Sequence, residues 1–499
     1  MRIAAGGVGL LLTTSLSLTA ATAGAQEATP SSPPVPQGPV APMVERAAPV
    51  AVPTDLVRAQ PGGLTSEQAG MRAGATSWSA KASMEAVRGA AARVDEAWAS
   101  FLPRLSGLGR YTRLSPLTPP SLGTLVGSTQ NLAPGDRPSV DSLIAIPLTF
   151  PVVLDNWLFQ ATLTVPVSDY FFRIDQTYTA ATRSEDAARW DVVAARASSS
   201  ANGQIAYYTW LRARGGVIVA VQALNDQKTH LRDSRNQFTV GNASKADVMR
   251  AETAVASAEL ALERAKNLAD LSEKQVRVAI HARDEEVIAP GEDLEAPPIP
   301  VQGSVKQMTA EALTARPEVK SADANAASAR EQTAAGRAGR YPSLSAFADG
   351  IVANPNSRIF PQTAKWFPTW DVGAQVTWSP NDVLVANGSV ADLESRAAAI
   401  EANRNNVRDG IEVEVTQYWQ AVREADFAIE SSTRELASAE EAYRVAGELF
   451  NNGRGTSTTL TDAETDLTRA RLDLLNAKSD ARIARIRLQH ALGRDARSP

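Results

Sequence analysis

The chain repeats itself over a distance of 212 residues, and this repeat constrains the possible folds more than any other feature of the sequence. Phe450–Gly453 aligns with Phe238–Gly241, and the register then continues without a gap. Ala463-Glu464-Thr465 falls on Ala251-Glu252-Thr253. Solenoid repeats have periods of about 20–50 residues, so a period this long indicates a duplicated half of a domain.

The repeated segments carry an unbroken helical seam. Apolar residues alternate at spacings of three and four, which is the pattern of a coiled-coil helix that shares one face with other helices. Across twenty seam positions only Ser272 is polar, and every second position is nearly always Ala, which lets neighbouring backbones approach closely. The seam positions are Val248, Ala251, Val255, Ala258, Leu262, Ala265, Ala269, Ser272, Val276 and Ala279, followed by Leu460, Ala463, Leu467, Ala470, Leu474, Ala477, Ala481, Ala484, Leu488 and Ala491.

Composition and charge exclude several classes of protein. The net charge of −5 over 499 residues indicates neither a nucleic-acid surface nor an acidic tail. The absence of Cys excludes disulfides, thiolate metal sites and a cysteine nucleophile. His230, His281 and His490 lie far apart on predicted helices and lack metal-ligand spacing, and no Gly-rich phosphate loop occurs. We therefore expect no enzyme activity, no cofactor and no metal.

The N-terminus has the pattern of an export signal. Met1-Arg2 provides a basic start, Gly9–Leu18 an apolar core, and Ala23–Ala25 small residues at cleavage spacing. A signal peptide is therefore expected over residues 1–25, the alternative being a cytosolic chain with an apolar start. The Pro-rich residues 26–62 then indicate an extended, disordered leader. No later run of 18 apolar residues occurs, so a membrane role would have to use strands.

The rest of the chain divides into two structural repeats, residues 63–289 and 309–493. A Pro-rich linker over 290–308 joins them, and residues 494–499 form a tail. Each repeat has the order helix, strand, loop, strand, long helix, tight turn, long helix. In the first repeat we expect a helix over 64–99, a strand over 102–114, an exposed loop over 115–156, a strand over 159–167, a helix over 168–236 interrupted around Gly203 and Gly215-Gly216, and a heptad helix ending near Ala289.

Two segments alternate between apolar and polar residues, as half-buried strands do. In the first, Gln160, Thr162 and Thr164 separate apolar residues; in the second, Trp370 to Trp378 alternate in the same way. Four strands per chain with apolar outer faces cannot close a barrel, and an open edge in lipid would leave backbone groups unsatisfied. Three chains would supply twelve strands, an even number found in outer-membrane barrels. Aromatic residues at the strand ends fit a membrane interface, the alternative being the edge of a soluble β-sandwich: Trp157, Phe159, Tyr170, Phe171, Phe172, Trp366, Phe367 and Trp370.

The Phe-x-x-Gly turn, the Ala/Leu heptads behind it, the Leu-Pro strand entry and the twofold repeat resemble the TolC family of outer-membrane efflux channels over about residues 64 to 493. This resemblance implies a mainly α fold with a β-barrel part. Long antiparallel coiled-coil helices would form an α-barrel in the periplasm, and a homotrimer would form a twelve-stranded barrel in outer-membrane lipid. It further implies a periplasmic adaptor protein and an inner-membrane transporter as partners, in drug or metal efflux or in type I secretion.

The resemblance places the two turns at the inner tip of the tunnel and assigns adaptor docking to them. The glycines allow a positive φ between antiparallel helices. Ser244 and Thr456 can cap the outgoing helices. The residues are Val240, Gly241, Asn242, Ala243 and Ser244 in the first turn, and Asn452, Gly453, Arg454, Gly455 and Thr456 in the second.

Members of the resembled family often carry acidic residues on the first turns of the last helix, where they form a ring at the closed end. The matching positions are Thr459 and Asp462, so one carboxylate remains. Three copies of Asp462 would still give a negative ring that favours cations. A carboxylate near a helix N-terminus is also favoured by the helix dipole, and this alternative applies to both Asp462 and Asp247.

The family also has Tyr, Arg and Asp residues that hold the closed end shut. At the matching positions this chain has Phe450, which lacks a hydroxyl, Gly455, which lacks a charge, and Asp247, which is kept. Arg454 lies beside the vacant position as a possible substitute. The pore aperture is therefore assigned to Asp462, Asp247 and Thr459, without a complete closing network.

Three functions are compatible with these patterns. The first is a passive export duct without an energy source of its own. The second is a periplasmic adaptor, which also combines a helical hairpin with β-structure but should carry one hairpin rather than two. The third is a coiled-coil scaffold outside the membrane, which would need neither alternating strands nor an export signal.

Overall fold

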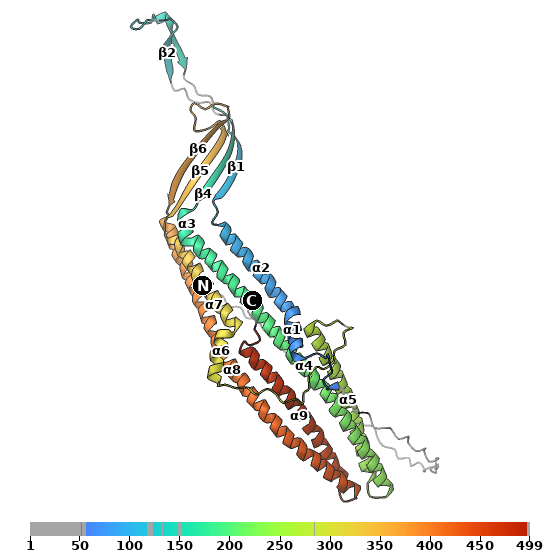
Figure 1. Cartoon of the computed structure of the whole chain (residues 1–499). Coiled ribbons are helices and arrows are strands. Elements are labelled where there is room, and N and C mark those ends of the chain that lie inside the picture. Colours follow the sequence, from blue (N-terminus) through green and yellow to red (C-terminus); the bar gives the residue numbers. More distant parts are fainter. Residues whose placement is uncertain are drawn as a thin grey trace, which may run out of the picture. The chain divides into compact units, whose positions relative to one another are not determined.

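The structure, a computed structural model, describes residues 51, 56–116, 123–131, 133–147, 152–283 and 285–496. The expected signal peptide, residues 1–25, lies outside these residues, as does most of the predicted leader. The chain is mainly helical with a smaller antiparallel sheet, as predicted (Figure 1). The helices are α1 Ser66–Thr76, α2 Trp78–Ala99, α3 Val167–Asp169, α4 Asp175–Thr239, α5 Lys245–Ile280, α6 Val305–Ala315, α7 Pro317–Arg337, α8 Pro380–Asn451 and α9 Ser457–Ala491, with short 3-10 turns at Val140–Ser142 and Ala338–Arg340 and a π-helical turn at Tyr170–Ile174.

Four long strands form one antiparallel sheet in the order β1-β4-β5-β6. Each structural repeat contributes two strands, and the pairing of β4 with β5 joins the repeats. β1 and β6 are therefore the edges of the sheet, and neither has a second partner among the described strands. The strands are β1 Arg104–Arg113, β4 Asp155–Val165, β5 Ser343–Asn354 and β6 Phe367–Thr377.

The two faces of this sheet differ in polarity, since one is almost entirely apolar and the other mixes polar with apolar residues. Phe159 lies opposite Gly109 and Val352, so the register places apolar or small residues on one face across all four strands. On the other face, Asp349 accepts hydrogen bonds from Gln160 and Thr162. The apolar face consists of Leu105, Gly107, Gly109, Tyr111, Trp157, Phe159, Ala161, Leu163, Leu344, Ala346, Ala348, Gly350, Val352, Pro368, Trp370, Val372, Ala374 and Val376.

The predicted loop over 115–156 contains structure that the sequence reading missed. β2 (Thr124–Ser128) and β3 (Leu143–Pro147) pair as an antiparallel hairpin, and the strand expected from 159 begins already at Asp155. The two short strands lie within a stretch rich in Pro, Ser and Gly, whose composition is that of an exposed loop. Five-residue strands give too few alternations to be recognised against this background.

The predicted interruptions of the helix over 168–236 are wrong, because α4 continues without a break through both glycine positions. A Cβ atom on Gly203 would lie 2.6 Å from the Cβ of Ala73 on α1, and one on Gly215 would lie 2.6 Å from Leu475 on α9. The glycines therefore allow other helices to approach α4 closely, and that packing outweighs their low helix propensity.

The heptad helix of the first repeat is shorter than expected. α5 ends at Ile280 rather than near Ala289, and His281 follows it in the left-handed conformation with φ 50°. The N–H of His281 bonds to the carbonyls of Arg277 and Val278, so a non-glycine residue terminates the helix.

The predicted seam is confirmed, because none of its twenty positions is exposed. α4 and α5 form a first antiparallel hairpin, and α8 and α9 form a second one (Figure 1). In the first hairpin Leu262 packs against Val217, Val221 and Leu224. In the second, the α9 seam residues Ala481, Ala484 and Leu488 pack with apolar residues of α8 such as Val415.

The segments that flank the first repeat are attached to it. Leu56, near the end of the predicted leader, packs against the apolar cluster between α4 and α5. In the predicted linker, the Glu292 carboxylate accepts hydrogen bonds from the N–H and hydroxyl of Ser66 (2.7 and 2.8 Å) and from the hydroxyl of Tyr208 (2.5 Å). α6 begins at Val305, so the last four residues of the predicted linker are helical.

Candidate functional site

The first predicted tip, Val240–Ser244, is a tight turn between α4 and α5. Gly241 has φ +82°, a conformation that costs other residues energy, and its N–H bonds to the Phe238 carbonyl at 3.1 Å. The N–H groups of Asn242 and Ala243 both donate to the carbonyl of Gln237, at 2.9 and 3.3 Å. These bonds satisfy the last carbonyls of α4 while the chain reverses direction.

A capping box starts the outgoing helix of the first tip. The Ser244 hydroxyl accepts a bond from the N–H of Asp247 at 3.2 Å, and the Asp247 carboxylate accepts from the Ser244 N–H at 3.0 Å. Arg250 lies 3.0 Å from the same carboxylate. The hydrogen bonds from Ser244, helped by Arg250, lower the pKa of Asp247. Asp247 thus has a local structural role as a helix cap.

The second predicted tip, Asn452–Thr456, repeats this geometry between α8 and α9. Gly453 has φ +68°, and the N–H groups of Arg454 and Gly455 each donate to the Leu449 carbonyl at 2.9 Å. The Thr456 hydroxyl caps α9 by accepting a bond from the N–H of Thr459 at 3.2 Å. The two turns therefore match residue for residue at the offset of 212 seen in the sequence.

The two tips contact each other through residues that the sequence reading did not single out. The Gln237 side chain donates to the Asn451 carbonyl at 3.0 Å, and Arg250 approaches the Thr458 hydroxyl at 3.5 Å. Each pair joins the first hairpin to the second. No signal in the sequence identifies them, because the partners are more than 200 residues apart.

No hydrogen bond or ion pair joins the predicted aperture residues Asp247, Thr459 and Asp462 to one another in the described part of the chain. Asp462 is exposed and has no hydrogen bond or ion pair among the described residues, whereas Asp247 is engaged in its own capping box. Phe450, at the position where a linking hydroxyl was expected, is buried and contacts His230 edge to face, with ring centroids 5.4 Å apart. A side chain at position 455 would collide with the end of α8.

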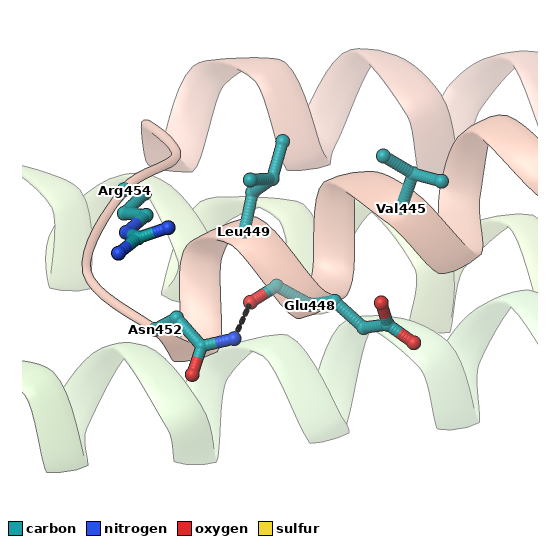
Figure 2. Close-up of a pocket in the computed structure, with 5 residues that line it drawn as sticks. All are labelled: Val445, Glu448, Leu449, Asn452 and Arg454. Carbon is teal, nitrogen blue, oxygen red and sulfur yellow. Dashed lines mark hydrogen bonds between the residues drawn. The ribbon is translucent and has the colours of Figure 1, made fainter.

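A groove of about 410 Å³ lies beside the second tip. Figure 2 shows its five lining residues, which come from the end of α8 and the turn that follows. Asn452 donates to the Glu448 carbonyl at 2.8 Å, and the Glu448 carboxylate pairs with Arg444. Val445 and Leu449 contribute apolar surface, and Arg454 supplies a cation with no ion pair in the described part of the chain.

In the described residues no group of three or more His, Asp or Glu side chains is arranged to hold a metal ion. Nor does any helix among them have a stretch of the length and apolarity needed to cross a bilayer.

The fold thus combines a sheet that has one continuous apolar face with two long helical hairpins. The family model for outer membrane efflux proteins matches residues 79–280 and 309–494. The chain therefore belongs to the outer membrane efflux protein family, which confirms the resemblance to TolC. It is accordingly a protein of the outer membrane.

Several solved structures share this fold. The outer-membrane channel OprN is 16% identical, with a TM-score of 0.70 over 90% of this chain and 96% of that chain. CusC is also 16% identical, with a TM-score of 0.69 over 90% and 97% of the two chains. The open state of the MtrE outer membrane channel of Neisseria gonorrhoeae is 17% identical, with a TM-score of 0.66 over 86% and 88%. No curated protein sequence gives a significant match.

Proposed function

We propose that three copies of this chain form a passive duct that carries cargo from an inner-membrane pump and a periplasmic adaptor to the outside of the cell. The observation that supports this most strongly is the sheet, whose apolar face runs across all four strands while both of its edges are open. A lipid-facing sheet with open edges leaves backbone groups unsatisfied, so further strands must complete it.

Copies of the same chain are suitable partners for both edges. The strands alternate in direction from β1 to β6, so an antiparallel ladder would continue if β1 of one copy paired with β6 of the next. Three copies would then close a ring of twelve strands. Exposed aromatic rings such as Trp157, Trp366 and Trp370 fit the level of the lipid headgroups.

The long hairpins would continue such a barrel as a tunnel of twelve helices in the periplasm. Apolar side chains exposed along α5 and α8 support contacts between copies, since exposed apolar surface is often buried at an interface. These residues are Met249, Leu260, Leu268, Leu271 and Val278 on α5, and Leu384, Val413, Phe427, Val445 and Leu449 on α8.

The two tips are proposed as the adaptor-docking surface. Both are exposed turns held rigidly by backbone hydrogen bonds, and loops on rigid scaffolds are common binding sites. The first tip presents the apolar Val240, which is 68% exposed, whereas the second presents Arg454 and the groove beside it. An adaptor would therefore meet an apolar tip and a polar, cationic tip in each chain.

The exposed Asp462 is proposed to face the aperture, where three copies would form a negatively charged ring that favours cations. Asp247 and Thr459 would lie near the same opening, but the Asp247 carboxylate is engaged in the capping box of α5, and the Thr459 hydroxyl is hydrogen-bonded to that of Thr456 at 2.9 Å. The open state solved for MtrE shows that an open form exists in that channel, which is compatible with a regulated opening here.

Membrane fractionation and reconstitution test the proposal together. The full-length protein, expressed in a bacterium with two membranes, is expected in the outer-membrane fraction. It should migrate as a trimer on a denaturing gel unless it is heated, and conduct ions when inserted into a planar bilayer. Recovery as a soluble periplasmic monomer would reject the duct.

A further inference from the structure

A buried polar cluster joins the two hairpins close to their tips. His230 of α4 lies between two residues of α9, with Nδ1 3.0 Å from the Glu464 carboxylate and Nε2 3.2 Å from the Ser457 hydroxyl. His230 is 2% exposed and Glu464 is 3% exposed. At about 1.5 Å per helical residue, His230 is roughly 14 Å from the end of α4. We call these three residues the His230 cluster.

The surroundings of the His230 cluster differ from those of the coiled-coil seams. The α4–α5 contact is built from Val217, Val221, Leu224 and Leu262, whereas the α4–α9 contact here is polar. Ser234, one turn after His230, is also buried, and its hydroxyl has no partner among the described residues. Polar contacts of this kind hold an interface only while their hydrogen bonds are satisfied.

Other titratable groups lie near the cluster on α4, α8 and α9. On the α4–α9 side, Asp226 pairs with Arg471 at 3.1 Å. On α8, burial raises the pKa of Tyr443 to about 12, so this residue stays neutral. The remaining charged neighbours on α4 are Asp233, Lys228 and Arg235, of which Lys228 faces Glu259 and Arg235 faces Glu252 on α5.

The two ring nitrogens of His230 contact Glu464 and Ser457 at the same time. An ionised Glu464 places a negative charge in a buried site, which is costly. Burial raises the pKa of Glu464 above its usual value, and the bond to His230 opposes this effect. Burial also raises the pKa of Asp226, and its pairing with Arg471 opposes this effect.

The raised pKa values of Glu464 and Asp226 determine whether the α4–α9 contact is stronger at acidic or at alkaline pH. A carboxyl group whose pKa is raised in the folded protein adds stability below its ordinary pKa of about 4.3, and this stability is lost as the pH rises through the raised value. Both Glu464 and Asp226 therefore favour the α4–α9 contact at acidic pH. The contact weakens toward neutral and alkaline pH.

We propose that the His230 cluster is a proton-dependent clamp between the two hairpins, which holds the periplasmic end of the chain closed more firmly at acidic than at alkaline pH. This inference rests on the proposed duct, since widening a ring of helices requires neighbouring hairpins to move apart. The clamp lies within one chain. It is distinct from the predicted Asp247 and Asp462 positions and from the tip contacts of Gln237 and Arg250.

The test measures the separation of the tips in the full-length protein, reconstituted in lipid, at pH 5 and pH 8. Because the chain has no native Cys, spin labels on Val240→Cys and Arg454→Cys, whose side chains are exposed at the two tips, report the distance between the tips without background. A hydrogen bond to a charged group is worth enough to change an equilibrium about tenfold. We therefore expect the separated population to be about tenfold larger at pH 8, with a matching increase in the open-channel conductance.

Substitutions in the His230 cluster distinguish a proton-dependent clamp from a contact that only stabilises the fold. Glu464→Gln keeps a hydrogen-bonding group of the same shape and should reduce the dependence on pH to the part that Asp226 contributes, and Glu464→Gln combined with Asp226→Asn should abolish it. His230→Gln removes the bond that lowers the pKa of Glu464, so the transition should move to higher pH. Glu252→Gln, at the matching position of the first repeat, is the control and should behave as the wild type.

Two results would overturn the clamp. One is a tip distance that is the same at both pH values in the wild type, and the other is an unchanged pH dependence in both Glu464→Gln and His230→Gln. A protein that does not insert as a channel would instead count against the proposed duct. The spin-label distances would still report on the clamp in that case, because both labels are on the same chain.

Discussion

Gly455 lies so close to the end of α8 that a Cβ atom at this position would be 2.9 Å from the backbone nitrogen of Phe450. Contacts this short with backbone atoms force the turn to shift. We therefore predict that Gly455→Ala destabilises the second tip by about 1–3 kcal/mol, as overpacking does elsewhere. The measurement is local hydrogen exchange of the amides of Arg454 and Gly455, which both bond to Leu449.

The first tip provides the matched control for that substitution. Ala243 already occupies the position equivalent to Gly455, and its N–H bonds to the Gln237 carbonyl as the N–H of Gly455 bonds to the Leu449 carbonyl. Ala243→Gly should therefore leave the exchange at the second tip unchanged. Equal protection of the second tip in wild type and Gly455→Ala would show that the turn has more room than its geometry indicates.

The two faces of the sheet make a separate prediction about membrane insertion. Val372 is on the apolar face of β6 and is 70% exposed, so Val372→Lys would place an ammonium group in lipid. A Lys on the lipid face of a barrel costs about 2–4 kcal/mol at the middle of the bilayer. The amount of heat-modifiable trimer in the outer membrane should fall accordingly. Gln375→Lys, on the polar face of the same strand, should leave it at the wild-type amount, and an equal loss for both variants would contradict the assignment of the faces.

The end of α9 contains a pair whose strength depends on pH. His490 Nδ1 is 2.8 Å from the Asp495 carboxylate, and this contact raises the pKa of His490. The stability that it adds is complete below the ordinary His pKa of about 6.5 and is lost as the pH rises through the raised value. Asp495→Asn should therefore lower the unfolding free energy at pH 6 by about 1–2 kcal/mol, as expected for a charge-assisted hydrogen bond, and have less effect at pH 9. Denaturant unfolding at the two pH values measures this difference, and an equal loss at both would rule out the ionic contribution.

Local periodicity was sufficient to predict the hairpins and their turns, because seam residues and turn glycines act through neighbours a few positions away. Val248, Leu460 and the residues that follow them at seam spacing lie where the pattern placed them. The same holds for Gly241 and Gly453, whose positive φ is a property of the turn itself.

Contacts between the two hairpins were not predictable in this way. His230 and Glu464 are 234 residues apart, and nothing near either residue indicates that the other is its partner. Gly203 and Gly215 were misinterpreted for a related reason. Their local effect is to weaken a helix, but their role depends on Ala73 and Leu475, which approach from other helices. Sequence reasoning therefore located the tips but missed the polar contacts that join them.

The small residues of the seam determine how closely the helices approach one another. Ala470 is fully buried on α9, and at this position the seam needs a methyl group rather than a larger side chain. Ala470→Leu would add three carbon atoms where neighbouring backbones are close, and should lower the unfolding free energy by about 1–3 kcal/mol. Ala261→Leu makes the same chemical change at an exposed position of α5 and is the control. Thermal unfolding in detergent followed by circular dichroism should show a lower midpoint for Ala470→Leu alone. If both variants unfolded at the wild-type temperature, the close approach of the helices would not depend on the size of the seam residues.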